Sequence, residues 1–163
     1  MKRLIITVCF SLSLSTVSIG MCWSGDYQKG LDAAQNGNYT AALKEWRPLA
    51  EQGHSESQFV LGLLYRNGKG VEKDFSKAIK WYLLAAENGH AKAQAKLGYM
   101  YVNGEGVNKN YVRAYMWGRL SEINENREGS ELKRIMTIEL TAAKIEEAER
   151  LVRECMKKDY KGC

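Results

Sequence analysis

A fourteen-residue stretch that occurs twice limits what this chain can fold into. Residues 58–71 and 94–107 are identical at eight positions when they are aligned with an offset of 36 residues, whereas average composition predicts about one match. The same offset aligns two further pairs, Ala78 with Ala114 and Trp81 with Trp117. Repeats of this length are typical of units that stack on one another, because a single unit cannot bury its own apolar face.

Each repeated unit is predicted to contain two helices. In the first full copy, apolar residues recur at spacings of three and four over residues 58–66, which is the period of a helix. The glycines of residues 67–70 end this helix, and Asp74 is predicted to cap a second helix that ends at residues 88–89. We therefore expect an all-α fold, an α-α superhelix (solenoid) of stacked antiparallel helix hairpins. Its units are predicted at about residues 26–54, 55–90 and 91–124.

Small and aromatic residues at equivalent positions are predicted to pack the hairpins together. Glycine and alanine allow two helices to approach closely, and Trp and Tyr fill the remaining space. The Gly-x-Gly segment follows a helix and not a strand, so we interpret it as a structural turn and not as a phosphate-binding loop. The predicted structural positions are Leu61, Gly62, Tyr65, Gly68, Gly70, Ala78, Trp81, Leu97, Gly98, Tyr101, Gly104, Gly106, Ala114 and Trp117.

The combined pattern resembles the Sel-one-like repeat, a relative of the tetratricopeptide repeat. This chain carries the pattern of that family as Gln58, Leu61, Gly62, Tyr65, Gly68, Gly70, Val71, Asp74, Ala78, Trp81, Tyr82, Ala85, Ala86, Glu87 and Gly89. The likeness extends over about residues 26–122. The first unit departs from it with a shorter turn and with Pro48 inside its second helix. The last copy has Asn110 in place of the Asp, and Trp117-Gly118 in place of Trp-Tyr.

The resemblance implies a non-enzymatic adaptor, exported by a bacterium, that binds a protein or peptide partner along the concave face of the solenoid. If the units stack as in tetratricopeptide repeats, the first helix of each unit lines that face. The residues predicted to contact a partner are Phe59, Leu63, Arg66, Asn67, Ala95, Tyr99, Val102 and Asn103. Aromatic and Arg side chains are good anchors for peptides. The alternative interpretation is that Phe59 and Leu63 pack between units.

The resemblance also implies a second class of function, a β-lactam-binding or cell-wall-modifying enzyme, because some disulfide-rich relatives have been linked to β-lactam binding. Ser130 and Lys133 match the Ser-x-x-Lys spacing of penicillin-binding enzymes, but the companion motifs are absent and Ser130 is predicted to cap a helix. His54 and His90 occupy equivalent turn positions, too far apart to share a metal, and are predicted to serve as turn or capping residues. We expect neither a metal nor a cofactor.

The N-terminus is predicted to be a signal peptide. Lys2 and Arg3 precede an apolar run over residues 4–14, and small residues follow up to Gly20. The run is too short to span a bilayer and no second run of spanning length exists, so we expect cleavage after Gly20, export to the periplasm or the medium, and no integral membrane span. Without Lys2 and Arg3 the net charge falls from +5 to +3, and the remaining basic residues alternate with acidic ones. We therefore expect no nucleic-acid partner.

Residues 125–163 are predicted to form C-terminal capping helices and a cysteine tail. A helix with one apolar stripe and one polar face closes the open end of a solenoid. The stripe consists of Leu140, Ile145, Ala148, Val152 and Cys155.

Two cysteines at the end of the chain are predicted to form a disulfide. Eight residues of continuous helix between Cys155 and Cys163 would span ~12 Å, and a disulfide joins Cα atoms ~4.4 to 6.8 Å apart. The tail must therefore fold back, which Gly162 permits. The alternative is a free Cys155 buried in the apolar stripe. Cys22 is a candidate lipid anchor, although Met21 departs from the small residue expected before it.

Overall fold

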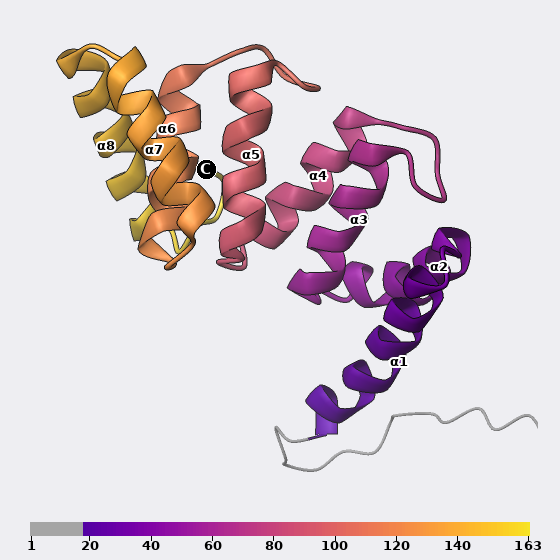
Figure 1. Cartoon of the computed structure of the whole chain (residues 1–163). Coiled ribbons are helices and arrows are strands. Elements are labelled where there is room, and N and C mark those ends of the chain that lie inside the picture. The colour runs from indigo at the N-terminus through magenta and orange to yellow at the C-terminus, as the bar shows by residue number, and fades with distance from the viewer. Residues whose placement is uncertain (1–17) are drawn as a thin grey trace, which may run out of the picture.

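Eight helices follow one another along residues 18–163, the part of the chain that the computed structural model describes, with side chains described from Asp26 onward. They are α1 (Ser18–Gln35), α2 (Tyr39–Glu51), α3 (Ser55–Asn67), α4 (Phe75–Ala86), α5 (Ala91–Asn103), α6 (Tyr111–Ile123), α7 (Arg127–Glu139) and α8 (Ala142–Lys157). Consecutive helices from α1 to α7 pack against each other, and α8 packs against α6. Figure 1 shows the hairpins stacked from α1–α2 at one end to α7–α8 at the other. The predicted all-α solenoid is confirmed.

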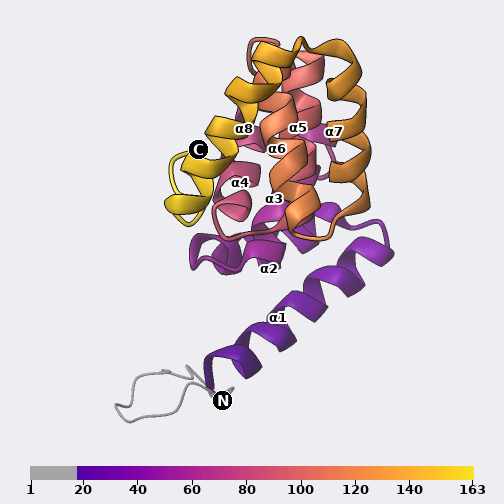
Figure 2. The same cartoon turned by 90° about the vertical axis from the view of Figure 1, so that its left-hand side faces the viewer.

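Residues 1–17 of the predicted signal peptide lie outside the part of the chain that the structure describes. Helix α1 begins at Ser18 and continues through Gly20, the predicted cleavage site. In Figure 2 the beginning of α1 projects beyond the stacked helices.

Polar side chains begin the helices at equivalent positions of the units. His54 and His90 cap α3 and α5, and their Nδ1 atoms accept hydrogen bonds from the third backbone N–H that follows, at 3.3 and 3.2 Å. Asp74 caps α4 and accepts from the N–H of Lys77 at 2.9 Å. An N-cap acceptor satisfies a backbone donor that the helix itself leaves unpaired. The predicted capping roles of both histidines and of Asp74 are confirmed.

The Gly-x-Gly turns end the first helices and connect each unit to the one before it. Gly68 and Gly104 have φ angles of 68° and 74°, in the left-handed region that ends a helix. A Cβ on Gly70 would lie 2.6 Å from the carbonyl carbon of Tyr39, at the start of α2. These turns are therefore structural, as predicted.

In two of the hairpins, a glycine of one helix faces an aromatic ring of the other. Tyr82 of α4 lies directly against Gly62 of α3, and Trp46 of α2 lies against Gly30 of α1. Tyr82 is fully buried, whereas Trp81, one of the predicted structural positions, is only partly buried. Several other predicted structural positions are fully buried, namely Leu61, Ala78, Leu97, Ala114 and Trp117.

Helix α7 continues the spacing of the repeat into the C-terminal segment. The helices α3, α5 and α7 contain thirteen residues each and begin 36 residues apart, at Ser55, Ala91 and Arg127. The N-cap of α7 is Asn126, so the prediction that Ser130 caps a helix is wrong. Leu140 lies beyond α7 as its C-cap, between the two helices. The capping element is therefore a pair of helices whose first member has the length and position of a fourth unit.

Buried glutamines join successive units by a repeated set of hydrogen bonds. The amide nitrogen of Gln94 donates to the carbonyl oxygen of Ala86 at 3.2 Å, and its oxygen accepts from Asn124 at 2.9 Å. Gln58 makes the same two bonds one unit earlier, at 3.0 Å to Ala50 and 3.3 Å from Asn88. Both glutamines are among the eight identical positions of the repeat, and spacing alone predicts no such bonds for them.

A disulfide between Cys155 and Cys163 closes the tail, and its Cα atoms lie 5.4 Å apart. The chain turns back at Asp159 and Tyr160, which have positive φ angles of 49° and 63°, before Gly162. The predicted bridge and the predicted reversal are confirmed, although the turn begins before the glycine. The folded tail reaches the α4–α5 turn, where the N–H of Gly162 donates to Glu87 at 2.9 Å.

Candidate functional site

The residues predicted to contact a partner fall into two groups by exposure. Leu63, Arg66, Tyr99 and Val102 are partly buried, and Asn67 and Asn103 are exposed. They come from α3 and α5, at positions separated by the repeat length. The side chains of Leu63, Tyr99 and Val102 also pack against the hydrophobic core with part of their surface.

Two predicted contact residues are buried, and for these the prediction is wrong. Ala95 is fully buried, and Phe59 is 6% exposed. The ring of Phe59 stacks on His90, with centroids 4.7 Å apart, and also contacts Tyr82 of its own unit. Phe59 therefore packs between units, which was the alternative interpretation. Inside a solenoid a helix contacts the unit before it and the unit after it. A residue selected only by its repeat spacing can therefore be buried against either of these units.

Arg66 is held in place by Glu105 of the next unit. Its Nε donates to Oε2 of Glu105 at 2.7 Å and its second guanidinium nitrogen to Oε1 at 3.1 Å. The hydrogen bonds from this pairing raise the pKa of Arg66. The two side chains keep 29% and 20% of their surface exposed. This two-pronged ion pair ties the end of α3 to the turn after α5, and Asn103 adds a hydrogen bond to Glu105 at 3.3 Å.

The hydroxyl of Tyr82 lies close to this ion pair. It is buried and has no hydrogen-bond partner among the described residues. Burial is the main cause that raises its pKa, while the charge of Arg66 opposes the rise and that of Glu105 adds to it. The hydroxyl therefore stays protonated at neutral pH and does not act as a base.

Tyr99 lies where α5 meets α7. Burial is the main cause that raises its pKa, and the nearby carboxylates of Glu128 and Glu131 add to the rise. Lys96 forms an ion pair with Glu128 at 2.6 Å, joining the two helices. The ring of Tyr99 is thus fixed by its neighbours and partly open to solvent, which suits a side chain that packs against a partner.

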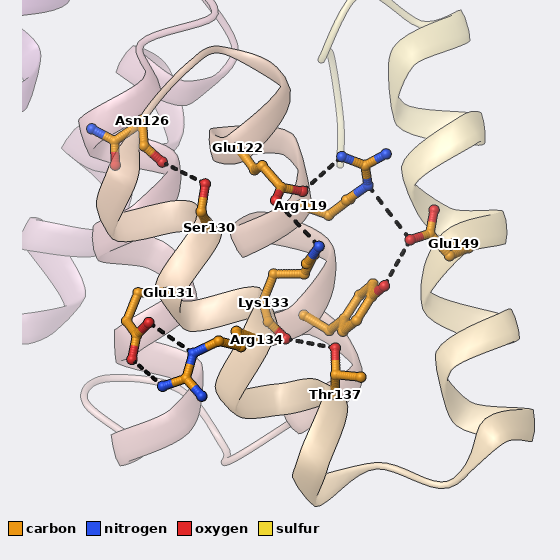
Figure 3. A network of polar contacts seen from close by, with 10 residues as sticks. Arg119, Glu122, Asn126, Ser130, Glu131, Lys133, Arg134, Thr137 and Glu149 are labelled. Atoms are coloured by element: carbon orange, nitrogen blue, oxygen red, sulfur yellow. Dashed lines mark hydrogen bonds and ion pairs between the residues drawn. The ribbon is translucent and has the colours of Figure 1, made fainter.

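The Ser-x-x-Lys pair does not form a catalytic dyad. The hydroxyl of Ser130 donates to the carbonyl oxygen of Asn126 at 3.5 Å, and Nζ of Lys133 pairs with Glu122 at 3.2 Å. Figure 3 shows Ser130 directed toward Asn126 and Lys133 directed toward Glu122. A lysine that activates a serine must lie within hydrogen-bond reach of its hydroxyl, and neither group has the other among its contacts.

Lys133 belongs instead to a polar network that joins α6, α7 and α8 (Figure 3). Arg119 of α6 donates to Glu122 at 2.7 Å and lies 3.6 Å from Glu149 of α8. The hydroxyl of Tyr115 donates to Glu149 at 2.8 Å, and burial followed by this hydrogen bond raises the pKa of Tyr115 to about 12. No spacing pattern predicts this network, because its members meet only when three helices pack.

Metal-binding and catalytic groups do not converge in the described part of the chain. His90 pairs with a single carboxylate, Glu56, at 2.8 Å, and no group of three or more His, Cys, Asp or Glu that could hold a metal occurs among residues 26–163, whose side chains are described. An open hollow of about 450 Å³ lies between the start of α6 and the α7–α8 turn. None of its lining residues is a Ser, Cys or His; they are Lys109, Asn110, Tyr111, Val112, Glu139, Leu140 and Lys144.

Comparison with known proteins agrees with the stacked hairpins and the repeated glycine turns. The sequence profile of the Sel1 repeat matches residues 55–90 and 91–121, which are the hairpins α3–α4 and α5–α6. The chain is a Sel1-like repeat protein. Sel1 repeats are typically found in non-enzymatic scaffolds for protein–protein interaction, and they suggest protein partners. No helix among residues 18–163 is long and apolar enough to cross a membrane.

Two solved Sel1-like structures resemble this chain. The first is c5321, described as a protective antigen present in uropathogenic Escherichia coli strains and displaying an SLR fold. It superposes with a TM-score of 0.78 at 29% identity, over 85% of this chain and 31% of its own. A Sel1 repeat protein from Oxalobacter formigenes superposes with a TM-score of 0.61 at 34% identity, over 66% of this chain and 44% of its own. Both relatives are therefore considerably longer than the part that matches.

A eukaryotic protein matches a shorter stretch. DAP3-binding cell death enhancer 1 of Rattus norvegicus is 37% identical over 49 residues, which are 30% of this chain and 10% of the rat protein. The same protein of Mus musculus matches to the same extent. A match of this length is little longer than one 36-residue repeat.

Proposed function

We propose that this Sel1-like chain is an exported scaffold that holds a protein or peptide partner along the concave face, which α3 and α5 line. The observation that carries the proposal is the row of partly exposed side chains at equivalent repeat positions. In each pair one residue comes from α3 and one from α5: Leu63 with Tyr99, Arg66 with Val102, and Asn67 with Asn103. Such a row offers apolar and polar contacts at a regular spacing, which suits an extended partner.

The position of the row on rigid helices supports this function. Arg66 is fixed by Glu105, and Tyr99 by the packing of α5 against α7. Side chains that are already ordered lose little conformational entropy when a partner binds. The even mixture of acidic and basic residues supports a protein or peptide partner over a nucleic acid.

Two features support an exported location, in the periplasm or outside the cell. The disulfide between Cys155 and Cys163 suggests an oxidising compartment. The basic and apolar residues at the N-terminus fit a leader that is removed after Gly20. A lipid anchor at Cys22 is the alternative; globomycin, which blocks processing of lipoproteins, would change the size of the chain only in that case.

A site-specific photo-crosslinker tests the partner-binding face. Benzoylphenylalanine placed at Leu63 or at Tyr99, in chain produced in its native cells, is expected to capture the same partner. The matched control carries the crosslinker at Leu84, which is 44% exposed on α4. Capture of the same protein from position 84, or of nothing from positions 63 and 99, would contradict the proposal.

The absence of enzymatic activity is tested separately with a labelled penicillin. Since Lys133 is held by Glu122 and Ser130 by Asn126, we expect no covalent label on the chain and no mass increase after incubation. A label that disappears in Ser130→Ala would instead establish the β-lactam-binding alternative.

A further inference from the structure

Helix α7 presents a face of large side chains that no described helix covers. Its buried side consists of Gly129, Leu132 and Met136. Away from these residues, Ile138 is 74% exposed and Ile135, on the flank of the buried side, is 37% exposed. Isoleucine is among the residue types most often buried, and two exposed isoleucines one turn apart form a patch that solvent does not favour.

The repeat spacing explains why this face is open. Ile135 and Ile138 stand 36 residues after Tyr99 and Val102. In α5 those positions are partly buried, and α7 packs alongside. The helix that follows α7 packs against α6 instead. The patch on α7 therefore corresponds to a surface that, one unit earlier, has a neighbouring helix beside it.

Charged residues lie on either side of the two isoleucines, a cation on the N-terminal side and an anion on the C-terminal side. An antiparallel copy of the same helix therefore presents opposite charges to them. Arg134, Ile135, Ile138 and Glu139 share one side of α7, because residues one turn apart lie above one another on a helix. Arg134 is exposed and pairs only with Glu131 of its own helix, through side chains that keep 63% and 49% of their surface exposed. Glu139 forms no ion pair with any residue from Asp26 to Cys163.

We propose that α7 is a self-association surface on which two copies of this chain pair with their α7 helices antiparallel. A twofold axis that passes between residues 136 and 137 places Ile135 opposite the partner's Ile138. The same axis places Arg134 opposite the partner's Glu139. Each contact occurs twice, because a twofold interface repeats every pair. A single symmetry operation thus covers both isoleucines and supplies Glu139 with a cation.

The charge order favours a second copy over an unrelated protein. The apolar pair and the charged pair are centred on the same point of the helix, which one twofold axis satisfies without adjustment. An unrelated partner would need an independent match to all four side chains. The interface uses residues of α7 and none of the α3 and α5 residues of the proposed partner face, so self-association and partner capture are measured by separate experiments.

Sedimentation equilibrium of the full chain over a dilution series tests the interface. We expect a reversible monomer–dimer equilibrium. Ile138→Asp should raise the dimer dissociation constant at least about tenfold, because a charge replaces two symmetric apolar contacts. The control Leu84→Asp changes another exposed apolar residue, on α4 and 44% exposed, and should leave the constant unchanged. A chain that stays monomeric, or an equal effect of Leu84→Asp, overturns the proposal.

Charge reversal identifies the residues that meet across the axis. Arg134→Glu and Glu139→Arg should each weaken the dimer roughly fivefold, because each creates two like-charge contacts. The double variant restores opposite charges across the axis, so its dissociation constant should return to within about twofold of the original. Recovery requires that these residues face each other in different copies, since they lie on α7 five residues apart. Additive weakening in the double variant, with helix content unchanged by circular dichroism, overturns the proposed geometry.

Discussion

Leu132 of α7 lies directly against Gly98 of α5. One unit earlier, the equivalent glycine is covered by Tyr82, whereas the residue that corresponds to Tyr82 in the next unit is Gly118. The missing aromatic ring leaves space between α5 and α6, and the following helix fills it. A departure from the repeat pattern in α6 therefore explains how α7 docks.

We predict that Gly98→Ala destabilises the protein by about 1 to 3 kcal/mol, because the added methyl meets Leu132 and the carbonyl oxygen of Ala114. Glycine to alanine inside an exposed helix would stabilise by roughly 0.5 to 1 kcal/mol. Urea unfolding measures the difference. The control Lys92→Ala, at an exposed position of α5, should change the free energy of unfolding by less than about 0.5 kcal/mol. A Gly98→Ala protein as stable as the original would exclude the close approach.

The hydrogen bonds of the buried Gln94 amide should contribute more to the free energy of unfolding than the volume of its side chain does. Gln94→Met keeps the shape but leaves the carbonyl oxygen of Ala86 and the amide of Asn124 without their partner. We expect a loss of about 2 to 3 kcal/mol in the free energy of unfolding, measured by urea denaturation. Gln28→Met, an exposed position of α1, serves as the matched control and should have no measurable effect. Equal stability of the two variants would show that the ladder of glutamine hydrogen bonds contributes little.

Reduction of the disulfide should lower stability without unfolding the solenoid. Opening a loop of eight-residue separation returns entropy to the unfolded chain and costs about 2 to 3 kcal/mol. We expect this shift in urea denaturation when a dithiol reductant is added, and the same shift in Cys163→Ser without reductant. The reductant should leave Cys163→Ser unchanged. An effect of the reductant on that variant would mean that another thiol is responsible.

Stability should also fall as the pH falls through the range in which His54 titrates. Burial lowers the pKa of His54 below 6.5, its value in the unfolded chain, although Glu56 partly opposes this. Below pH 6.5 the unfolded state therefore binds more protons than the folded state, so the free energy of unfolding decreases; above that pH the contribution is fully retained. Protonation also removes the acceptor that caps α3.

Denaturation at a series of pH values between about 7.5 and 5.5, above the range where carboxylates titrate, measures this decrease. His54→Asn keeps a capping acceptor but does not titrate, so its stability should depend less on pH in this window. A steeper or equal dependence in His54→Asn would assign the effect to other groups.

The sequence was sufficient for the fold because the repeat constrains it at many positions at once. Leu61 and Leu97 are matched by the 36-residue offset and are fully buried, and the capping role of Asp74 follows from its local chemistry. Local and repeated signals of this kind do not depend on knowing which helix lies beside which. The disulfide was predictable for a similar reason, since the two cysteines are close in sequence and a tail that folds back, unlike a continuous helix, brings them together.

The candidate site was harder to predict, because exposure depends on how units stack. Phe59 and Ala95 follow the same spacing rule as Leu63 and Tyr99 but point into the junctions between helices. The ion pair between Arg66 and Glu105 joins a helix end to a turn 39 residues away, which no periodicity reveals. By contrast, the start of α7 could have been found, because Asn126 follows His54 and His90 at the repeat spacing.

The glutamine ladder also restricts how proteins of this kind can change length. Gln58 and Gln94 each reach back eight residues to a helix end and are reached from an asparagine thirty residues ahead. Duplication of a 36-residue block that contains Gln58 or Gln94, within the repeated hairpins, recreates both bonds. An insertion of another size between these residues leaves a buried glutamine amide without its hydrogen-bond partners. Gene rearrangements that preserve a stable protein should therefore add or remove whole hairpins.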